Sequence, residues 1–192
     1  ELMKTIQKEG TMKALICDIE KPLEECMALL NEYNEPLNLV QSVTSKKVWY
    51  SRTPNPMYNV AVIDLGTKLN LIKGLNKAGC NVISFPYNTT KEEILKYKPN
   101  GLFISSGPGN PENLNEVVEL INSFIGVLPI FGVGLGHQLI GLAYGAKALK
   151  MKCGHHGCNY PVKNLKTGKV EISVQNHLYT IDRQSLKGTA LK

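Results

Sequence analysis

The fold of this chain is decided by the stretch Pro129-Ile130-Phe131-Gly132-Val133-Gly134-Leu135-Gly136-His137-Gln138. It predicts a buried strand, then a tight turn flanked by glycines, then a helix. This is the pattern of a nucleophile elbow, in which a sharp strand-to-helix turn lifts one side chain out at the top of a parallel sheet and a following backbone N–H can bind an oxyanion. The central residue here is Gly134, which has no side chain. The sequence therefore predicts a scaffold for acyl transfer without the attacking group.

Strands and helices alternate before the elbow. The expected strands are short apolar runs at residues 59–64, 81–85, 101–105 and 129–133. The expected helices cover residues 68–78, a segment that opens at a capping box formed by Thr90 and Glu93, and residues 112–124. Beyond residue 145 we expect shorter β segments, notably 170–175. Alternation at this spacing predicts an α/β fold with an open, mostly parallel sheet and helices on both faces.

The first 50 residues follow a different pattern. The expected elements there are helices at residues 2–8 and 23–31, a strand at 13–17 and an edge strand at 43–50. Two prolines, Pro54 and Pro56, then interrupt regular structure. We therefore expect part of a small α+β N-terminal domain at residues 1–50, a linker at residues 51–57, and a sheet domain at residues 58–192.

Composition favours a soluble globular protein with neither a nucleic-acid nor a membrane partner. The net charge of +6 comes from scattered lysines with no basic run, which is typical of a solvated surface. The longest apolar stretch, residues 124–136, is too short to span a bilayer. Five cysteines form an odd set with no framework spacing, which favours a reducing compartment and therefore a cytoplasmic location.

Three polar or glycine-rich tracts follow predicted strands: residues 105–109, 132–138 and 175–177. Ligands of open α/β sheets bind at the carboxyl ends of the strands, so we expect these tracts to form one site. A cysteine at position 134 would have its thiolate stabilised by the helix N-terminus, with the N–H groups of Leu135 and Gly107 as oxyanion donors. The alternative interpretation is structural: tight turns, and glycines that only allow close strand–helix packing.

A zinc site is the alternative use of the tract that contains Cys153, His155, His156 and Cys158. The spacing offers neither a C-x-x-C pair nor an H-x3–5-H pair, and adjacent histidines would point apart on a strand. We therefore predict no metal site and keep a metal-binding module as the alternative. Asn176 and His177 could contact a small ligand, or could serve packing alone.

Together these motifs resemble the small, glutamine-hydrolysing subunit of carbamoyl-phosphate synthase, a class I (triad-type) glutamine amidotransferase. The resemblance runs along almost the whole chain. The motifs that carry it lie at residues 64–70, 105–111, 131–138, 145–147, 154–162 and 175–179. The tracts at 154–162 and 175–179 distinguish this subunit from other amidotransferases of the class.

The resemblance implies that glutamine is deamidated through a cysteinyl thioester. Ammonia then passes to a large, ATP-consuming subunit that makes carbamoyl phosphate for arginine or pyrimidine synthesis. By motif, Gly134 stands at the nucleophile position, and the backbones of Leu135 and Gly107 would hold the oxyanion. The residues expected to contact glutamine are Gly107, Gly109, Leu135, Gln138, Asn176, Leu178 and Tyr179. No cofactor is expected in this chain, because ATP and a metal ion would bind to the large subunit.

This chain departs from the family pattern in four ways. Gly134 replaces the cysteine, and Leu178 stands where the family usually has glycine. The catalytic His and Glu of an H-P-E motif have no counterpart, and neither has a glutamine-contacting serine of the N-terminal domain, so we expect an internal portion of the subunit. We predict that the chain has no glutaminase activity. The alternative is a non-catalytic regulatory or scaffolding subunit of an ammonia-using synthetase.

Overall fold

The computed structural model describes residues 1–34 and 36–191 and divides the chain into two compact units. One unit combines Glu1–Pro36 with Lys150–Tyr179, and the other combines Leu37–Leu149 with Thr180–Lys192. None of the three boundaries between the units falls at the expected linker, residues 51–57, and the division into domains at that linker stays a prediction. Residues 35 and 192, one in each predicted domain, lie outside the described residues.

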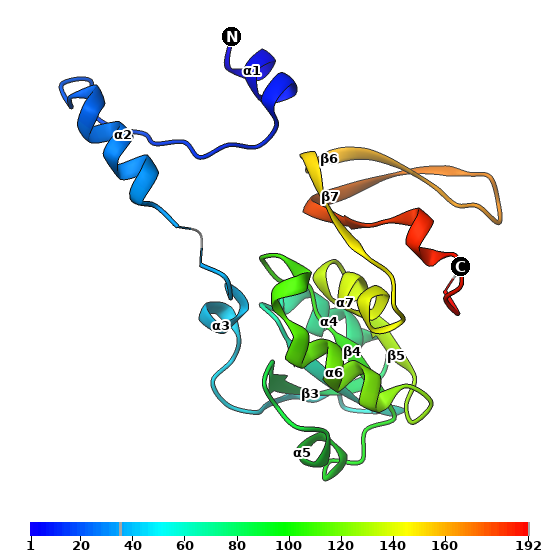
Figure 1. Cartoon of the computed structure of the whole chain (residues 1–192). Helices are drawn as coiled ribbons and strands as arrows, with labels where there is room; N and C mark the ends of the chain where they lie inside the picture. Colours follow the sequence, from blue (N-terminus) through cyan, green and yellow to red (C-terminus); the bar gives the residue numbers. More distant parts are fainter. Residues whose placement is uncertain (35, 192) are drawn as a thin grey trace. The chain divides into compact units, whose positions relative to one another are not determined.

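A five-stranded sheet organises the unit that contains the elbow (Figure 1). Its strands are β1 (Trp49–Ser51), β2 (Tyr58–Asp64), β3 (Cys80–Pro86), β4 (Gly101–Ile104) and β5 (Ile130–Gly132), in the spatial order β1-β3-β2-β4-β5. The pairs β2–β3, β2–β4 and β4–β5 are parallel, and the edge strand β1 runs antiparallel to β3. The predicted mostly parallel sheet is confirmed.

Helices cover both faces of this sheet. The helices are α4 (Leu69–Lys77), α5 (Lys91–Leu95), α6 (Asn115–Phe124) and α7 (Leu135–Ala143). On one face, Ile63 of β2 shares a buried core with Phe124 of α6 and Leu139 of α7. On the other face, Val62 packs in a smaller core with Ile72 of α4. Successive strand residues therefore face opposite cores, as the two-residue period of a strand requires, and the α/β prediction is confirmed.

Two helix starts show how local sequence sets a boundary. Thr90 accepts a hydrogen bond from the Glu93 N–H at 3.3 Å, and the Glu93 carboxylate accepts one from the Thr90 N–H at 3.2 Å, which confirms the predicted capping box. The helix expected at 112–124 is instead two elements, a 3₁₀ turn (Pro111–Asn113) and α6. They are separate because Leu114, with φ −119° and ψ 46°, leaves the helical region.

The strand predicted at residues 13–17 is wrong, because residues 12–18 form neither helix nor strand. Lys13 instead donates hydrogen bonds to carbonyl oxygens at the end of α2 (Leu23–Glu32) and just beyond it. The segment is therefore held by a helix, and it takes no place in a sheet. A short apolar run such as residues 14–17 could not by itself distinguish these two outcomes.

The edge strand predicted at residues 43–50 is much shorter than expected. Residues Val40–Val43 form a short helix, α3, and β1 begins only at Trp49. The Ser45 N–H donates to the Asp64 carboxylate at 2.9 Å, so this part of the backbone is bonded to a side chain and not to a neighbouring strand.

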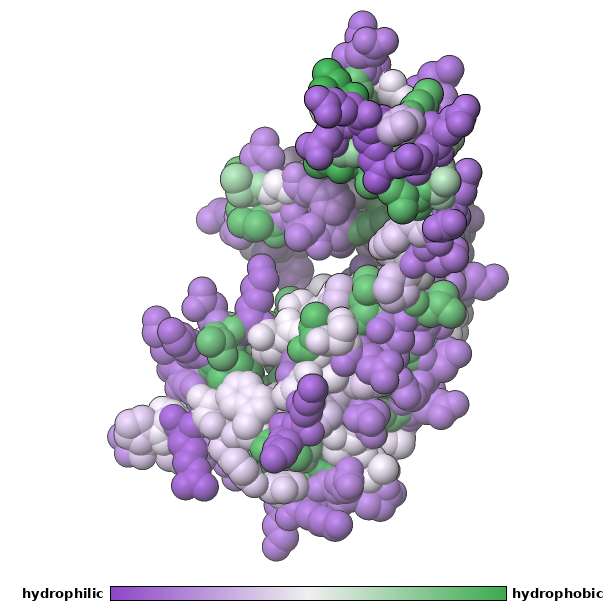
Figure 2. Space-filling view, turned by 90° about the vertical axis from the view of Figure 1, so that its left-hand side faces the viewer, coloured by the Kyte–Doolittle hydropathy of each residue, from purple (hydrophilic) through white to green (hydrophobic). Residues whose placement is uncertain are grey.

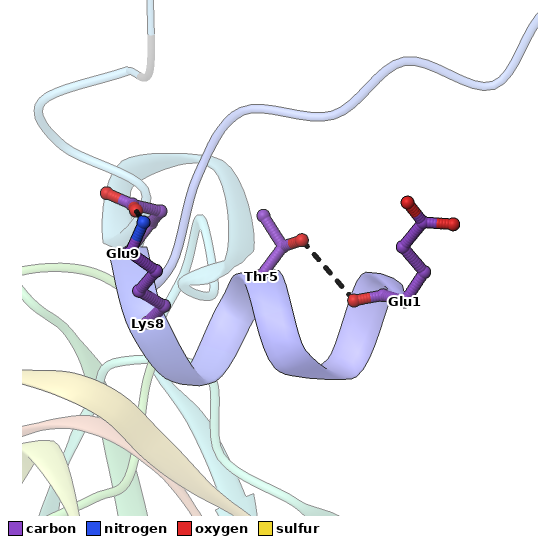
Figure 3. Close-up of polar contacts among 4 residues, drawn as sticks. All are labelled: Glu1, Thr5, Lys8 and Glu9. Atoms are coloured by element: carbon purple, nitrogen blue, oxygen red, sulfur yellow. Dashed lines mark hydrogen bonds and ion pairs between the residues drawn. The ribbon is translucent and has the colours of Figure 1, made fainter.

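The other unit contains α1 (Leu2–Glu9), α2 and most of a two-stranded sheet, β6 (Ala148–Lys163) and β7 (Val170–Ile181). Helix α1 buries no residue. Its polar contacts include the hydrogen bond from the Thr5 hydroxyl to the Glu1 carbonyl, 3.3 Å, and an exposed ion pair between Lys8 and Glu9, 3.4 Å (Figure 3). The Cys153 thiol of β6 also donates to the Ile6 carbonyl at 3.4 Å. Contacts of this exposed kind contribute little to stability.

Hydrophilic residues cover most of the face seen in Figure 2, and the apolar areas between them are small. Across residues 1–34 and 36–191, none of the helices has the length and apolar character needed to cross a bilayer.

Candidate functional site

The predicted elbow is present between β5 and α7. Strand β5 ends at Gly132, and α7 begins at Leu135 with Gly134 as its N-cap residue. Gly134 has φ 57° and ψ −116°, a conformation that costs a residue with a side chain of the order of 1–3 kcal/mol. Its carbonyl oxygen accepts the Gln138 N–H at 3.2 Å, which closes the first turn of the helix. The order strand, turn, helix is confirmed, but the prediction that the strand is buried is wrong, because β5 is an edge strand and its Phe131 is 63% exposed.

Two glycines of the elbow are required by packing. A Cβ on Gly132 would lie 2.6 Å from the carbonyl carbon of Gly136. A Cβ on Gly136 would lie 2.6 Å from the carbonyl carbon of Ile104 in β4. Both distances are too short for non-bonded atoms, so the structural interpretation holds for Gly132 and Gly136.

Packing does not explain Gly134. A Cβ there would have the Cβ of Ser106, at 3.3 Å, as its nearest neighbour, and Gly134 is exposed. A side chain could be placed at this position with a shift of a few tenths of an ångström. The strained backbone, and not a lack of space, is what favours glycine here.

The glycine-rich turn after β4 lies against the elbow. The Ser105 hydroxyl accepts the Leu65 N–H at 2.9 Å and donates to the Ser106 carbonyl at 3.0 Å. The Ser105 carbonyl accepts the Gly136 N–H at 3.1 Å. A Cβ on Gly107 would lie 2.8 Å from the Leu65 Cβ, so the chain approaches β2 too closely for any other residue. The first two predicted tracts are therefore brought together.

Asp64 fixes the loop at the end of β2. Its carboxylate accepts the N–H groups of Ser45 at 2.9 Å, Gly66 at 3.0 Å and Thr67 at 2.8 Å. Burial raises the pKa of this carboxyl, but the hydrogen bonds from Thr67, Gly66 and Ser45 outweigh burial and hold the pKa below its usual range. Our sequence reasoning used Asp64 only within a family motif. An acidic residue between an apolar strand and a glycine was the available signal.

The remaining predicted residues of the elbow unit differ in exposure. Leu135 and Gln138 of α7 are 4% and 7% exposed, so both side chains are buried. Gly109 has φ 97°, the left-handed region that favours glycine, and lies beside Leu39. The side chains of Leu135 and Gln138 are therefore buried, whereas Val133, Gly134 and His137 of the elbow are exposed.

The third predicted tract lies within a strand and not at its end. Strand β7 continues to Ile181, so Asn176, Leu178 and Tyr179 are interior positions of β7, in the other compact unit. The expectation that residues 175–177 follow a strand is therefore wrong, because contacts with residues of β6 continue the strand beyond them.

Histidines of β6 bond to the polar side chains of β7. His155 Nδ1 lies 3.1 Å from Gln175 Oε1 and 3.1 Å from His177 Nε2. His156 Nδ1 lies 2.6 Å from Asn176 Oδ1. The adjacent histidines thus have different partners, as expected on a strand. The side-chain amide oxygen of Asn176 is bonded to His156.

A metal cluster and a cavity are the two other kinds of site to consider. In the part of the chain that the structure describes, no three His, Cys, Asp or Glu side chains lie close enough to hold a metal ion. A cavity of about 500 Å³ lies at the end of β3, and Lys46, Lys47, Lys96, Glu93 and Tyr97 contribute to its lining. None of the predicted site residues lines this cavity.

Comparison with known proteins gives the same class of fold. The family described as glutamine amidotransferase class-I matches residues 61–191. Carbamoyl phosphate synthase small chains of Bacillus caldolyticus and Listeria innocua are 43% identical to this chain over all 192 residues. The chain spans about half the length of these curated relatives, 52% of each.

Two solved structures are similar in fold. A putative GMP synthase component from Thermoplasma acidophilum matches 66% of this chain and 68% of its own, with a TM-score of 0.56 and 23% identity. A glutamine amido transferase from Methylobacillus flagellatus matches 67% of this chain and 57% of its own, with a TM-score of 0.51 and 16% identity. At these identities the likeness concerns the fold alone.

Replacing Gly136 tests the packing of the elbow. We expect Gly136→Ala to lower the free energy of unfolding by about 2 kcal/mol or more, because the new Cβ would collide with the backbone of Ile104. Gly74→Ala, in α4 with no atom within 4 Å of the new Cβ, is the matched control and should stabilise by roughly 1 kcal/mol or less. Urea denaturation measures both. Unchanged stability of Gly136→Ala would contradict the packing argument.

Asp64 should make stability depend on pH. Its folded pKa is lowered from 3.8, so its contribution is complete above that value and is lost as the pH falls through the lower folded pKa. We expect Asp64→Asn to cost roughly 1–2 kcal/mol at pH 7, and the difference from the unmodified chain to shrink below about pH 4. The exposed Glu119→Gln is the control. A difference that is constant from pH 7 to pH 3 would exclude the charged carboxylate as its cause.

Proposed function

The chain belongs to the class I glutamine amidotransferase family, and on this premise we propose that it is the glutamine-binding part of a carbamoyl-phosphate synthase small subunit. The 43% identity to small chains of that enzyme along the whole chain supports this choice of family member. The proposal includes L-glutamine as ligand, a partnership with a large synthetase subunit, and a cytoplasmic location. ATP and a metal ion belong to the large subunit in this proposal.

The chemistry proposed for the complete site is acyl transfer. A cysteine thiolate at the elbow attacks the carboxamide carbon of glutamine, and the resulting oxyanion accepts hydrogen bonds from backbone N–H groups. Collapse of this intermediate expels ammonia and leaves a thioester, which water then hydrolyses to glutamate and the free thiol. In this chain the N–H groups proposed as donors are those of Leu135 and Gly107, because their tracts lie side by side.

Gly134 makes this particular chain inactive in our proposal. It has no atom that could attack a carboxamide, and removal of a triad nucleophile elsewhere costs about a millionfold in turnover. The observation that carries the proposal is the contrast among the elbow glycines: Gly132 and Gly136 are required by packing, whereas Gly134 occupies a site with room for a side chain. In this proposal the chain keeps the fold and the binding of glutamine without the catalytic thiol.

A non-catalytic scaffolding or regulatory subunit is the second candidate. Two observations favour it: the missing side chain at Gly134, and Leu178 at a position where the family usually has glycine. Leu178 is half-buried in β7, and its Cα would lie 3.1 Å from a Cβ on Gly154. Such a chain would support a large subunit that uses free ammonia.

Calorimetric titration with L-glutamine tests the first candidate. We expect a saturable heat with a dissociation constant of about 1 mM or tighter, equivalent to about −4 kcal/mol. Glutamate and asparagine should give no comparable signal, and ammonia release should stay at the background rate. Absence of glutamine binding would overturn the first candidate in favour of the second. Ammonia release that persists after thiol blocking would overturn the proposed mechanism.

Restoring the nucleophile gives a second test. We expect the thiol of Gly134→Cys to be alkylated by the chloromethyl ketone analogue of glutamine at least tenfold faster than that of Val133→Cys. The reason is that position 134 is the N-cap of α7, where the positive end of the helix dipole stabilises a thiolate, whereas position 133 precedes the cap. Peptide mapping separates these products from those of the native cysteines, and free glutamine should protect position 134. Equal rates, without protection, would mean that the pocket is not formed.

A further inference from the structure

Two thiols outside the elbow lie in contact. Cys26 is in α2, and Cys17 lies in the irregular segment that precedes this helix. Their sulfur atoms are 3.2 Å apart. A disulfide bond is about 2.05 Å long, so closing one requires an approach of only about 1 Å. Neither cysteine is among the residues predicted or proposed for the glutamine site.

A second contact fixes the segment along α2. The Lys13 ammonium group donates hydrogen bonds to the carbonyl oxygens of Leu30, in the last turn of the helix, and of Tyr33, the residue that follows it. The four residues from Lys13 to Cys17 can span about 13 Å when extended, and the helix rises about 10 Å from Cys26 to Tyr33. Both contacts can therefore form at once, and the segment lies beside the helix with a fixed register.

The two thiols differ in access to solvent. Cys17 is exposed, whereas Cys26 is 8% exposed. The hydrogen bond with Cys17, followed by burial, raises the pKa of the Cys26 thiol, so Cys26 remains protonated at neutral pH. A dissolved reagent therefore meets Cys17 first, and Cys26 is placed to react second.

We propose that Cys17 and Cys26 are a site of reversible disulfide formation, by exchange with a low-molecular-weight disulfide such as oxidised glutathione. The Cys17 thiolate attacks one sulfur of the reagent, and one reduced thiol leaves. Cys26 then loses its proton to solvent, attacks the Cys17 sulfur and displaces the second reduced thiol. One disulfide is reduced to two thiols while the protein loses two hydrogens, so atoms and electrons balance.

The remaining cysteines are different in their surroundings. Cys80 is buried in the other compact unit, and Cys153 and Cys158 are exposed on β6. Over residues 1–34 and 36–191, the hydrogen bond between Cys17 and Cys26 is the only one that joins two cysteine sulfurs. Oxidation should therefore be selective for this pair. Its product would tie residues 17–26 into a covalent loop at the start of α2.

Peptide mapping after oxidation tests the proposal. The whole chain is treated with oxidised glutathione at pH 8, quenched in acid and digested without reduction by a protease that cuts after glutamate. Cleavage after Glu20 and Glu25 places Cys17 and Cys26 in separate peptides. We expect the linked Cys17–Cys26 peptides to exceed any other linked pair at least tenfold, and to separate with dithiothreitol.

Variants distinguish the two steps. Cys26→Ser should retain glutathione on Cys17, because no second thiol displaces it, and Cys17→Ser should abolish the link. Cys153→Ser is the matched control with an exposed thiol removed elsewhere, and the link should form as in the unmodified chain. Glutathione that remains on Cys17 while Cys26 is intact, or linked pairs without selectivity, would overturn the proposal.

Discussion

The close approach of α7 to the sheet is the constraint on which the elbow depends. Gly132 and Gly136 allow helix and strand backbones to meet where any side chain would collide with Ile104 or with the helix itself. The Gly136 N–H then bonds to the Ser105 carbonyl, so the start of α7 is fixed to the turn after β4. This approach leaves Gly134 as the point where the chain turns outward, and it places the N-terminus of a helix at an edge of the sheet.

Buried polar groups at the strand ends keep that edge rigid. The Asp64 carboxylate gathers N–H groups from both the β2 loop and the segment before β1, and the Ser105 hydroxyl links the ends of β2 and β4. Each of these groups is buried and hydrogen-bonded, so rearrangement would leave a polar atom unsatisfied. The same contacts that hold the loops therefore fix the backbone at Gly107.

Much of this organisation could be predicted from the sequence, because strands β2 to β5 are short apolar runs separated by helices, one of which, α5, begins at a recognisable capping box. The elbow could be predicted as well, because the close packing of strand and helix there requires glycines, and these are visible in the sequence at positions 132 and 136. The strand expected at residues 13–17 could not be excluded, since its fate depends on the bond from Lys13 to α2. The contact of Cys17 with Cys26 likewise depends on that pairing, which no spacing in the sequence reveals. The full length of β7 depends on partners in β6.

Under the function proposed above, the backbone conformation of Gly134 makes exchange between cysteine and glycine at this position asymmetric. A side chain at φ 57° and ψ −116° holds strain, so in that proposal the change from cysteine to glycine relieves about 1–3 kcal/mol of backbone strain and removes the attacking thiol. Return to cysteine would restore that strain, so the change from cysteine to glycine is easier for the fold than its reversal.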